Sequence, residues 1–118
     1  MESELAVKRL SALAQSGRLD VFRLLVRSGH EGLAAGDIAR ATQVPANTLS
    51  AQMTVLANAG LVKSRRDGRS IIYTADYDGM GDLLVYLMED CCQGRPEICA
   101  SITQSAIACC TPAQGALS

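Results

Sequence analysis

The stretch that decides the fold covers residues 45–74 and reads PANTLSAQMTVLANAGLVKSRRDGRSIIYT. Its first half repeats apolar residues at intervals of three and four, which places Leu49, Met53, Leu56 and Ala57 on one stripe. Pro45 suits the first turn of a helix because it has no N–H to leave unbonded. We therefore expect an amphipathic helix from about residue 46 to residue 58.

After that helix the apolar period changes to the alternation of β-strands. Residues 61–66 and 69–74 are strand-like runs, and Asp67-Gly68 between them is a preferred pair for a two-residue hairpin turn. Upstream, a shorter helical pattern covers about residues 34–41 and is joined to the main helix by the tight connection 42–44. Two short helices followed at once by a hairpin predict a winged helix-turn-helix, a mainly α fold with a small β-hairpin (α+β).

Three further helices are expected around this motif, over residues 2–15, 18–28 and about 80–92, with Gly29 ending the second. In the first helix we expect Leu5, Leu10 and Leu13 to be apolar contacts and Glu4, Lys8 and Arg9 to be solvated. In the last helix we expect one stripe of Met80, Leu84, Leu87 and Cys91, with Leu83 beside it.

The composition narrows the class of protein. The chain has 118 residues, which suits one core, and we divide it into a domain at 1–92 and a cysteine-containing tail at 93–118. Aromatic residues make up 3%, too few for stacking platforms that bind single-stranded nucleic acid. No apolar run approaches the ~18 residues of a membrane span, so we expect a soluble cytoplasmic protein with no membrane partner.

The formal net charge of -1 hides a segregation of charge along the chain. Residues 1–60 carry +1, residues 61–75 carry +3 and residues 76–118 carry -5. The basic hairpin can therefore meet phosphates although the whole chain is slightly acidic. Candidate contacts to double-stranded DNA are short polar residues on the outer face of the main helix and basic residues of the hairpin. They are Asn47, Thr48, Ser50, Gln52, Arg65, Arg66 and Arg69.

All five cysteines lie in the last 28 residues: Cys91, Cys92, Cys99, Cys109 and Cys110. Their odd number and clustering do not resemble a disulfide framework, and thiols in a cytoplasm are expected to be reduced. Adjacent cysteines also make a poor disulfide, because their Cα atoms lie ~3.8 Å apart and ordinary disulfides need about 4.4 to 6.8 Å. The cluster therefore points to metal, metalloid or redox chemistry.

The chain resembles the ArsR family of bacterial winged-helix repressors. The matching stretches are Leu19-Asp20-Val21-Phe22-Arg23-Leu24-Leu25, Gly36-Asp37-Ile38-Ala39, Asn47-Thr48-Leu49-Ser50-Ala51-Gln52-Met53, Leu56-Ala57-Asn58-Ala59-Gly60-Leu61-Val62 and Arg66-Asp67-Gly68-Arg69. The resemblance implies a homodimer formed through the first and last main helices. It also implies that recognition helices at about 46–58 enter the major grooves of an inverted-repeat operator, and that an inducer releases the DNA.

Departures from the family decide which inducer is expected. Ala34-Ala35-Gly36 stands where the founding arsenic sensors carry Cys-Val-Cys, and His30 is the only histidine, so the zinc and cobalt sites of other members are not matched. Gln52 replaces the histidine of the usual Ser-x-His of the recognition helix. Residues 91–99, CCQGRPEIC, instead resemble members with a vicinal cysteine pair and a third cysteine, which sense trivalent arsenic and antimony.

The chemistry of the thiols agrees with that resemblance. Trivalent arsenic is soft and takes three sulfur ligands, which Cys91, Cys92 and Cys99 supply, with Cys109 and Cys110 as possible auxiliary ligands. Zinc or cadmium with a fourth thiolate, and thiol redox sensing, stay open as alternatives. A small thiol reductase is disfavoured because no cysteine lies in a Cys-x-x-Cys motif. We expect no catalytic site and no organic cofactor.

Overall fold

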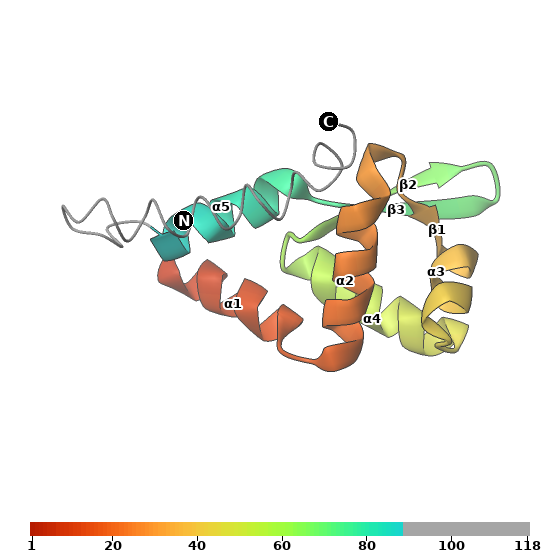
Figure 1. Ribbon diagram of the computed structural model, residues 1–118, viewed down its shortest axis with the longest axis horizontal. Coiled ribbons are helices and arrows are strands. Elements are labelled where there is room, and N and C mark those ends of the chain that lie inside the picture. The colour runs from red at the N-terminus through yellow and green to blue at the C-terminus, as the bar shows by residue number, and fades with distance from the viewer. Residues whose placement is uncertain (89–118) are drawn as a thin grey trace, which may run out of the picture. The chain divides into compact units, whose positions relative to one another are not determined.

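The computed structural model describes residues 1–88, which fold into five α-helices, a 3-10 turn and a three-stranded sheet (Figure 1). The elements in order are α1 (Ser3–Leu13), α2 (Ser16–Ser28), η1 (Gly29–Glu31), β1 (Leu33–Ala34), α3 (Ala35–Thr42), α4 (Ala46–Asn58), β2 (Val62–Asp67), β3 (Ser70–Ala75) and α5 (Tyr77–Met88). The predicted winged helix-turn-helix is confirmed, and the bounds of α4 are those expected from the sequence. Residues Met1–Leu84 make one compact unit.

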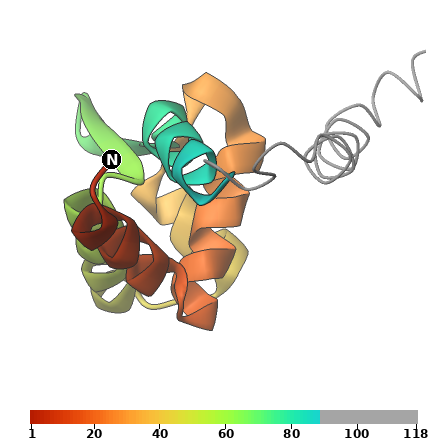
Figure 2. The same ribbon diagram turned by 90° about the vertical axis from the view of Figure 1, so that its left-hand side faces the viewer.

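Helix α2 contacts α1, α3, α4 and β3. It runs through the middle of the view in Figure 1, and Figure 2 shows it to the right of α1. The core that it organises is aliphatic, as the scarcity of aromatic residues requires. The side chains of Leu25, Ile38, Leu56 and Leu61 are fully buried, and Phe22 is 5% exposed. Gly29 ends α2 with φ 73°, which confirms the predicted stop.

The sheet has the order β1-β3-β2, with both pairs antiparallel. Strand β1 was not predicted, because two residues carry no period; its pairing with β3 is a tertiary contact. The predicted hairpin turn is displaced by one residue. Asp67 pairs with Ser70, so the loop consists of Gly68 and Arg69. Only Gly68 of the two has a positive φ, 64°, which matches the turn type that places glycine first.

Helix α1 is turned differently from the prediction. Its buried residues are Ala6, Arg9 and Ala12, whereas Leu5 and Leu10 are exposed. The small alanines allow α1 to lie close to its neighbours. Arg9 was expected in solvent, but its guanidinium donates hydrogen bonds to the carbonyl oxygens of Ala59 (2.8 Å) and Gly79 (2.7 Å). Hydrogen bonds from a charged donor contribute about 1.5–3 kcal/mol each, which offsets the desolvation of the cation.

Helix α5 begins three residues before the expected start. The side chain of Asp76 caps it by accepting a hydrogen bond from the N–H of Gly79 (2.9 Å). Of the apolar stripe predicted on this helix, Leu84 and Leu87 are 51% and 49% exposed in the single chain, whereas Leu83 beside it is 4% exposed. Among residues 1–88, no helix combines the length and the apolar character that a membrane crossing requires.

The core makes a simple prediction about stability. Replacing Leu25, which is fully buried, by alanine should lower the free energy of unfolding by about 2–5 kcal/mol, because the change leaves a cavity beside α4 and β3. Leu19 of the same helix is 39% exposed and serves as the matched control. Urea denaturation followed by circular dichroism measures both variants. Equal losses in Leu25→Ala and Leu19→Ala would contradict the burial pattern of α2.

Candidate nucleic-acid interface

Helix α4 is held to the core by one apolar face and leaves the opposite face free. Leu49, Met53 and Leu56 are at most 2% exposed and face the core, whereas Ala57, predicted on the same stripe, is exposed. The turn before α4 is tight: Gln43 adopts φ 58°, and the N–H of Val44 donates to the carbonyl of Ala39 (3.1 Å). This turn brings α4 directly after α3, and the two helices pack against each other.

Three of the four polar residues predicted on α4 are exposed as expected: Asn47, Thr48 and Ser50. Sequence reasoning missed Thr54 and Asn58, which are exposed one and two turns further along. The signal was available, since steps of three or four residues from Asn47 and Ser50 reach both. The free face of α4 therefore carries short hydrogen-bonding side chains over its whole length.

Gln52 does not lie on that free face, so its predicted position is wrong. The side chain is 9% exposed, because three- and four-residue steps put it beside Leu49 and Leu56 on the buried side. Its Oε1 atom has no hydrogen-bond partner. A Cβ atom at Gly17 would lie 2.6 Å from Nε2 of Gln52, so this glutamine packs directly against the first turn of α2.

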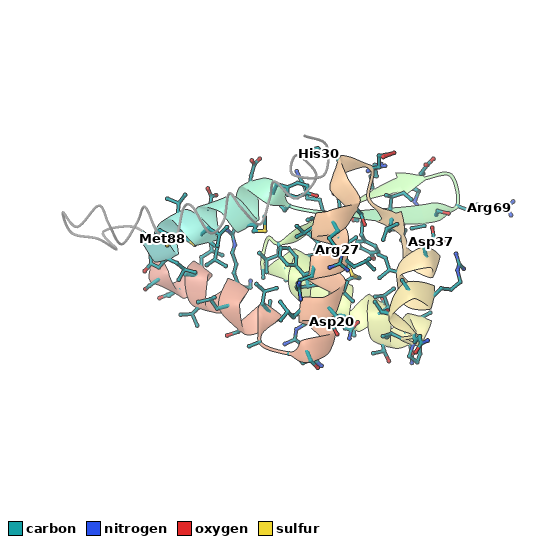
Figure 3. The ribbon with its side chains drawn as sticks, viewed as in Figure 1. Asp20, Arg27, His30, Asp37, Arg69 and Met88 are labelled. Carbon is teal, nitrogen blue, oxygen red and sulfur yellow. The ribbon has the colours of Figure 1, made fainter. Side chains whose placement is uncertain are left out.

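The hairpin separates the three predicted arginines. Side chains alternate along β2, and Val62 and Ala75 form the buried pair, so Arg66 shares the core-side face with Ile71. Arg65 points to the opposite face, where it donates a hydrogen bond to the carbonyl of Glu31 (3.0 Å). Arg69 lies in the loop at the far end of the hairpin (Figure 3).

The surface suited to double-stranded DNA is thus smaller than the one predicted. It combines the free face of α4 with Arg66 and Arg69 and leaves out Gln52 and Arg65. A helix fits the major groove of B-DNA, and a basic loop beside it can reach the adjacent backbone or minor groove. The DNA contacts of individual residues stay predictions.

The predicted thiol site falls on Cys91, Cys92, Cys99, Cys109 and Cys110, and all five lie outside the described residues. Within residues 1–88 there is no group of three or more His, Cys, Asp or Glu side chains that could hold a metal ion. His30 instead packs edge-on against the ring of Tyr77, with 5.0 Å between ring centroids.

Comparison with known proteins agrees with the fold. The model of a helix-turn-helix domain family matches residues 13–65. The HTH-type transcriptional regulator YgaV of Escherichia coli (strain K12) is 28% identical over 90 residues, which are 76% of this chain and 89% of YgaV.

Two solved structures are also similar. One is a homodimeric winged helix-turn-helix DNA-binding domain from Mycobacterium bovis, described as a possible ArsR-family transcriptional regulator. It is 30% identical, with a TM-score of 0.61 and coverage of 74% of this chain and 80% of that one. The other, a possible transcriptional regulator for arsenical resistance, is 29% identical, with a TM-score of 0.61 and coverage of 68% and 80%.

The fold and the polar free face of α4 define a winged helix-turn-helix DNA-binding domain. With the similarities above, the chain belongs to the winged helix-turn-helix transcriptional regulators of the ArsR type.

The two faces of β2 predict different roles for neighbouring arginines. Arg66→Ala should weaken binding to a duplex recovered by in vitro selection and reduce the salt dependence of binding by about one phosphate contact. Arg65→Ala is the matched control and should keep the wild-type affinity within about twofold, since this guanidinium points to the opposite face and donates to the backbone carbonyl of Glu31. Fluorescence anisotropy over a range of salt concentrations measures both. A loss in Arg65→Ala as large as in Arg66→Ala would contradict the assignment.

The burial of Gln52 predicts that its amide is not a contact to DNA. Gln52→Met removes an unpartnered polar atom without changing the volume greatly, so the free energy of unfolding should stay the same or rise by about 1 kcal/mol. DNA affinity should stay within about twofold, whereas Asn47→Ala, on the free face, should lower affinity without a change in stability. Equal losses of affinity in the two variants would place Gln52 at the DNA.

Proposed function

We propose that the protein is a homodimeric repressor that binds an inverted-repeat operator and is released from it by trivalent arsenic or antimony. The free face of α4 and the basic end of the hairpin make the DNA contacts. The thiolates of Cys91, Cys92 and Cys99 bind the inducer, with Cys109 and Cys110 as auxiliary ligands. The protein acts in the cytoplasm through binding and not through catalysis, without an organic cofactor.

The observation that carries the DNA part of the proposal is the division of α4 into two faces. Three apolar side chains fix the helix to the core, and Asn47, Ser50 and Thr54 are left exposed on it. Short polar side chains on a rigid helix can read base edges at little cost in entropy. Arg66 and Arg69 add positive charge on the neighbouring hairpin, which favours the phosphate backbone.

The dimer is supported by apolar side chains that face solvent in the single chain. Val7 and Leu10 lie three residues apart on the outer side of α1 and are 60% and 42% exposed, and Leu84 of α5 is 51% exposed. Large apolar side chains grouped on a helix mark an interaction surface more often than a free surface. The similar domain from Mycobacterium bovis is described as homodimeric. An isologous dimer through α1 and α5 would cover these side chains.

The inducer is argued from donor chemistry. Trivalent arsenic and antimony bind soft thiolates in threes, and residues 91–99 supply three thiols within nine positions of the chain. The sequence places Cys91 three residues after the last described residue of α5. A similar protein is described as a possible regulator for arsenical resistance. A site there can act on the same helix that carries the exposed apolar side chain of Leu84.

Release requires the inducer to bind the DNA-free state more tightly than the DNA-bound state. A coupling free energy of about 1–3 kcal/mol lowers operator affinity about 5- to 150-fold, and this is sufficient for a switch. Thiol oxidation could use the same residues, as a disulfide of Cys92 or Cys99 with Cys109 or Cys110. The two mechanisms differ in whether reducing buffer abolishes the response.

The proposal predicts that arsenite lowers operator affinity about 5- to 150-fold in reducing buffer, measured by anisotropy on a duplex obtained by in vitro selection. Cys99→Ser should lose both the release and the sulfur-to-arsenic charge-transfer absorbance. The double variant Cys109→Ser/Cys110→Ser removes only the auxiliary ligands and leaves Cys91, Cys92 and Cys99, so it should keep most of the release.

Three results would contradict this mechanism. Unchanged affinity at saturating arsenite would exclude the inducer. Release by mild peroxide but not by arsenite, with a mass loss of two protons per bridge, would replace it with redox sensing. Release by zinc or cadmium alone would assign the thiols to a divalent metal.

A further inference from the structure

Three helices meet at the side chain of Arg9. Its Nε donates to the carbonyl oxygen of Ala59 (2.8 Å), the residue that ends α4, and its Nη1 donates to the carbonyl oxygen of Gly79 (2.7 Å) in the first turn of α5. Arg9 itself belongs to α1 and is 9% exposed. One guanidinium therefore holds the end of the recognition helix and the start of α5 at a fixed distance from α1.

Two glycines bring the backbones close enough for this contact. A Cβ atom at Gly79 would overlap the carbonyl oxygen of Gly60, and one at Gly60 would lie 2.8 Å from Nη2 of Arg9. The chain also closes on itself here, since the N–H of Asp76 donates to the carbonyl of Leu61 (2.8 Å). The backbone at the end of α4 is thus in contact with the backbone at the start of α5, and Arg9 forms hydrogen bonds to both segments.

Arg9 does not owe its burial to a carboxylate, because among residues 1–88 it forms no salt bridge. Its charge faces carbonyl oxygens, including that of Ala59 at the negative end of the α4 dipole. An apolar side chain could fill the same space without desolvating a charge, whereas a planar fork of donors fixes direction as well as distance. An arginine at this position is therefore better suited to fixing the relative orientation of the helices than to filling space.

The junction at Arg9 lies between two surfaces whose relative orientation it can set. Helix α1 and α5 carry the exposed apolar residues Val7, Leu10 and Leu84, and α4 carries the polar face for DNA. Arg9 connects the apolar surface of α1 and α5 to the polar face of α4. Any rotation of α4 relative to α1 and α5 must stretch or break a hydrogen bond to Arg9.

We propose that Arg9 is a positioning residue that sets the separation and angle of the two recognition helices in the dimer, and thereby the spacing between half-sites that the protein accepts. The inference rests on the proposed homodimer through α1 and α5. In a two-fold dimer every change at the junction is applied twice, so a small rotation of α4 becomes a mismatch with successive major grooves, which lie one helical turn apart.

The test compares binding of the full-length chain to three duplexes: the sequence recovered by in vitro selection, the same sequence with two base pairs inserted between half-sites, and a single half-site. Wild-type protein should strongly prefer the selected spacing. Arg9→Met should reduce that preference about tenfold while leaving single half-site binding within about twofold. Arg9→Lys keeps the positive charge but loses the planar guanidinium. Its preference for the selected spacing should therefore lie between those of the wild type and Arg9→Met.

Arg18→Met is the matched control. Arg18 also donates to backbone carbonyls, those of Ala12 (2.6 Å) and Ser11 (3.3 Å), but both acceptors belong to α1, so these hydrogen bonds join α2 to α1 and not to α4 or α5. This variant should keep the spacing preference even if it loses stability. Light scattering should give a dimer for every variant, and circular dichroism should show which variants fold; if Arg9→Met does not fold, Arg9→Lys decides the question.

The outcomes separate this inference from the proposed function. Arg9 variants that keep the wild-type ratio between the two paired duplexes, with all affinities lowered equally, would overturn the positioning role and leave the dimer intact. A wild-type protein that is monomeric would overturn the proposed dimer and the role of Arg9 together. A dimeric wild-type protein that binds both spacings equally would overturn the role of Arg9 alone. Loss of spacing preference in Arg18→Met equal to that in Arg9→Met would also overturn it, because destabilisation alone would explain both.

Discussion

The burial of one face of α4 is the constraint on which the rest of the structure depends. Leu49, Met53 and Leu56 must leave water, and α2 and the base of the hairpin supply the apolar surface that receives them. Once that face is fixed, the opposite face has nothing in the chain to pack against, and Asn47, Ser50 and Thr54 are left exposed on it. The DNA-binding surface is therefore a direct consequence of how the core is built, and not an addition to it.

The same constraint explains why the core needs so few aromatic residues. Two elements that approach closely through alanines and glycines fill their interface with small aliphatic groups, as Ala6, Ala12 and Ala59 do around α1 and the end of α4. Close approach also brings backbone carbonyls within reach of one another, and Arg9 supplies the donors that these carbonyls need. A polar side chain at the meeting point of three helices is thus compatible with a well-packed core.

Local sequence patterns predicted the helices, strands and turns well, but they predicted the tertiary contacts of individual residues less well. The recognition helix, the hairpin strands and the stop at Gly29 follow from periodicity and turn residues within a few positions of each other. Arg9 and Gln52 were placed in solvent because polarity is a poor guide to burial when the partner is a distant carbonyl or a glycine. Strand β1 and the one-residue displacement of the turn depend on pairing across the sheet, which no single stretch of sequence encodes. The sequence did identify the free face of α4 as the candidate site, except at Gln52.

The central claim is that the protein binds DNA with the free face of α4 and the core-side face and tip of the hairpin. The most direct test is to map amide chemical-shift changes in isotopically labelled protein titrated with a selected duplex. Large changes should follow Asn47, Ser50, Thr54 and Arg66, together with the loop at Arg69, and should be small at Arg65 and along α2. Changes concentrated on α2 or on the Arg65 face, with α4 unaffected, would contradict the claim.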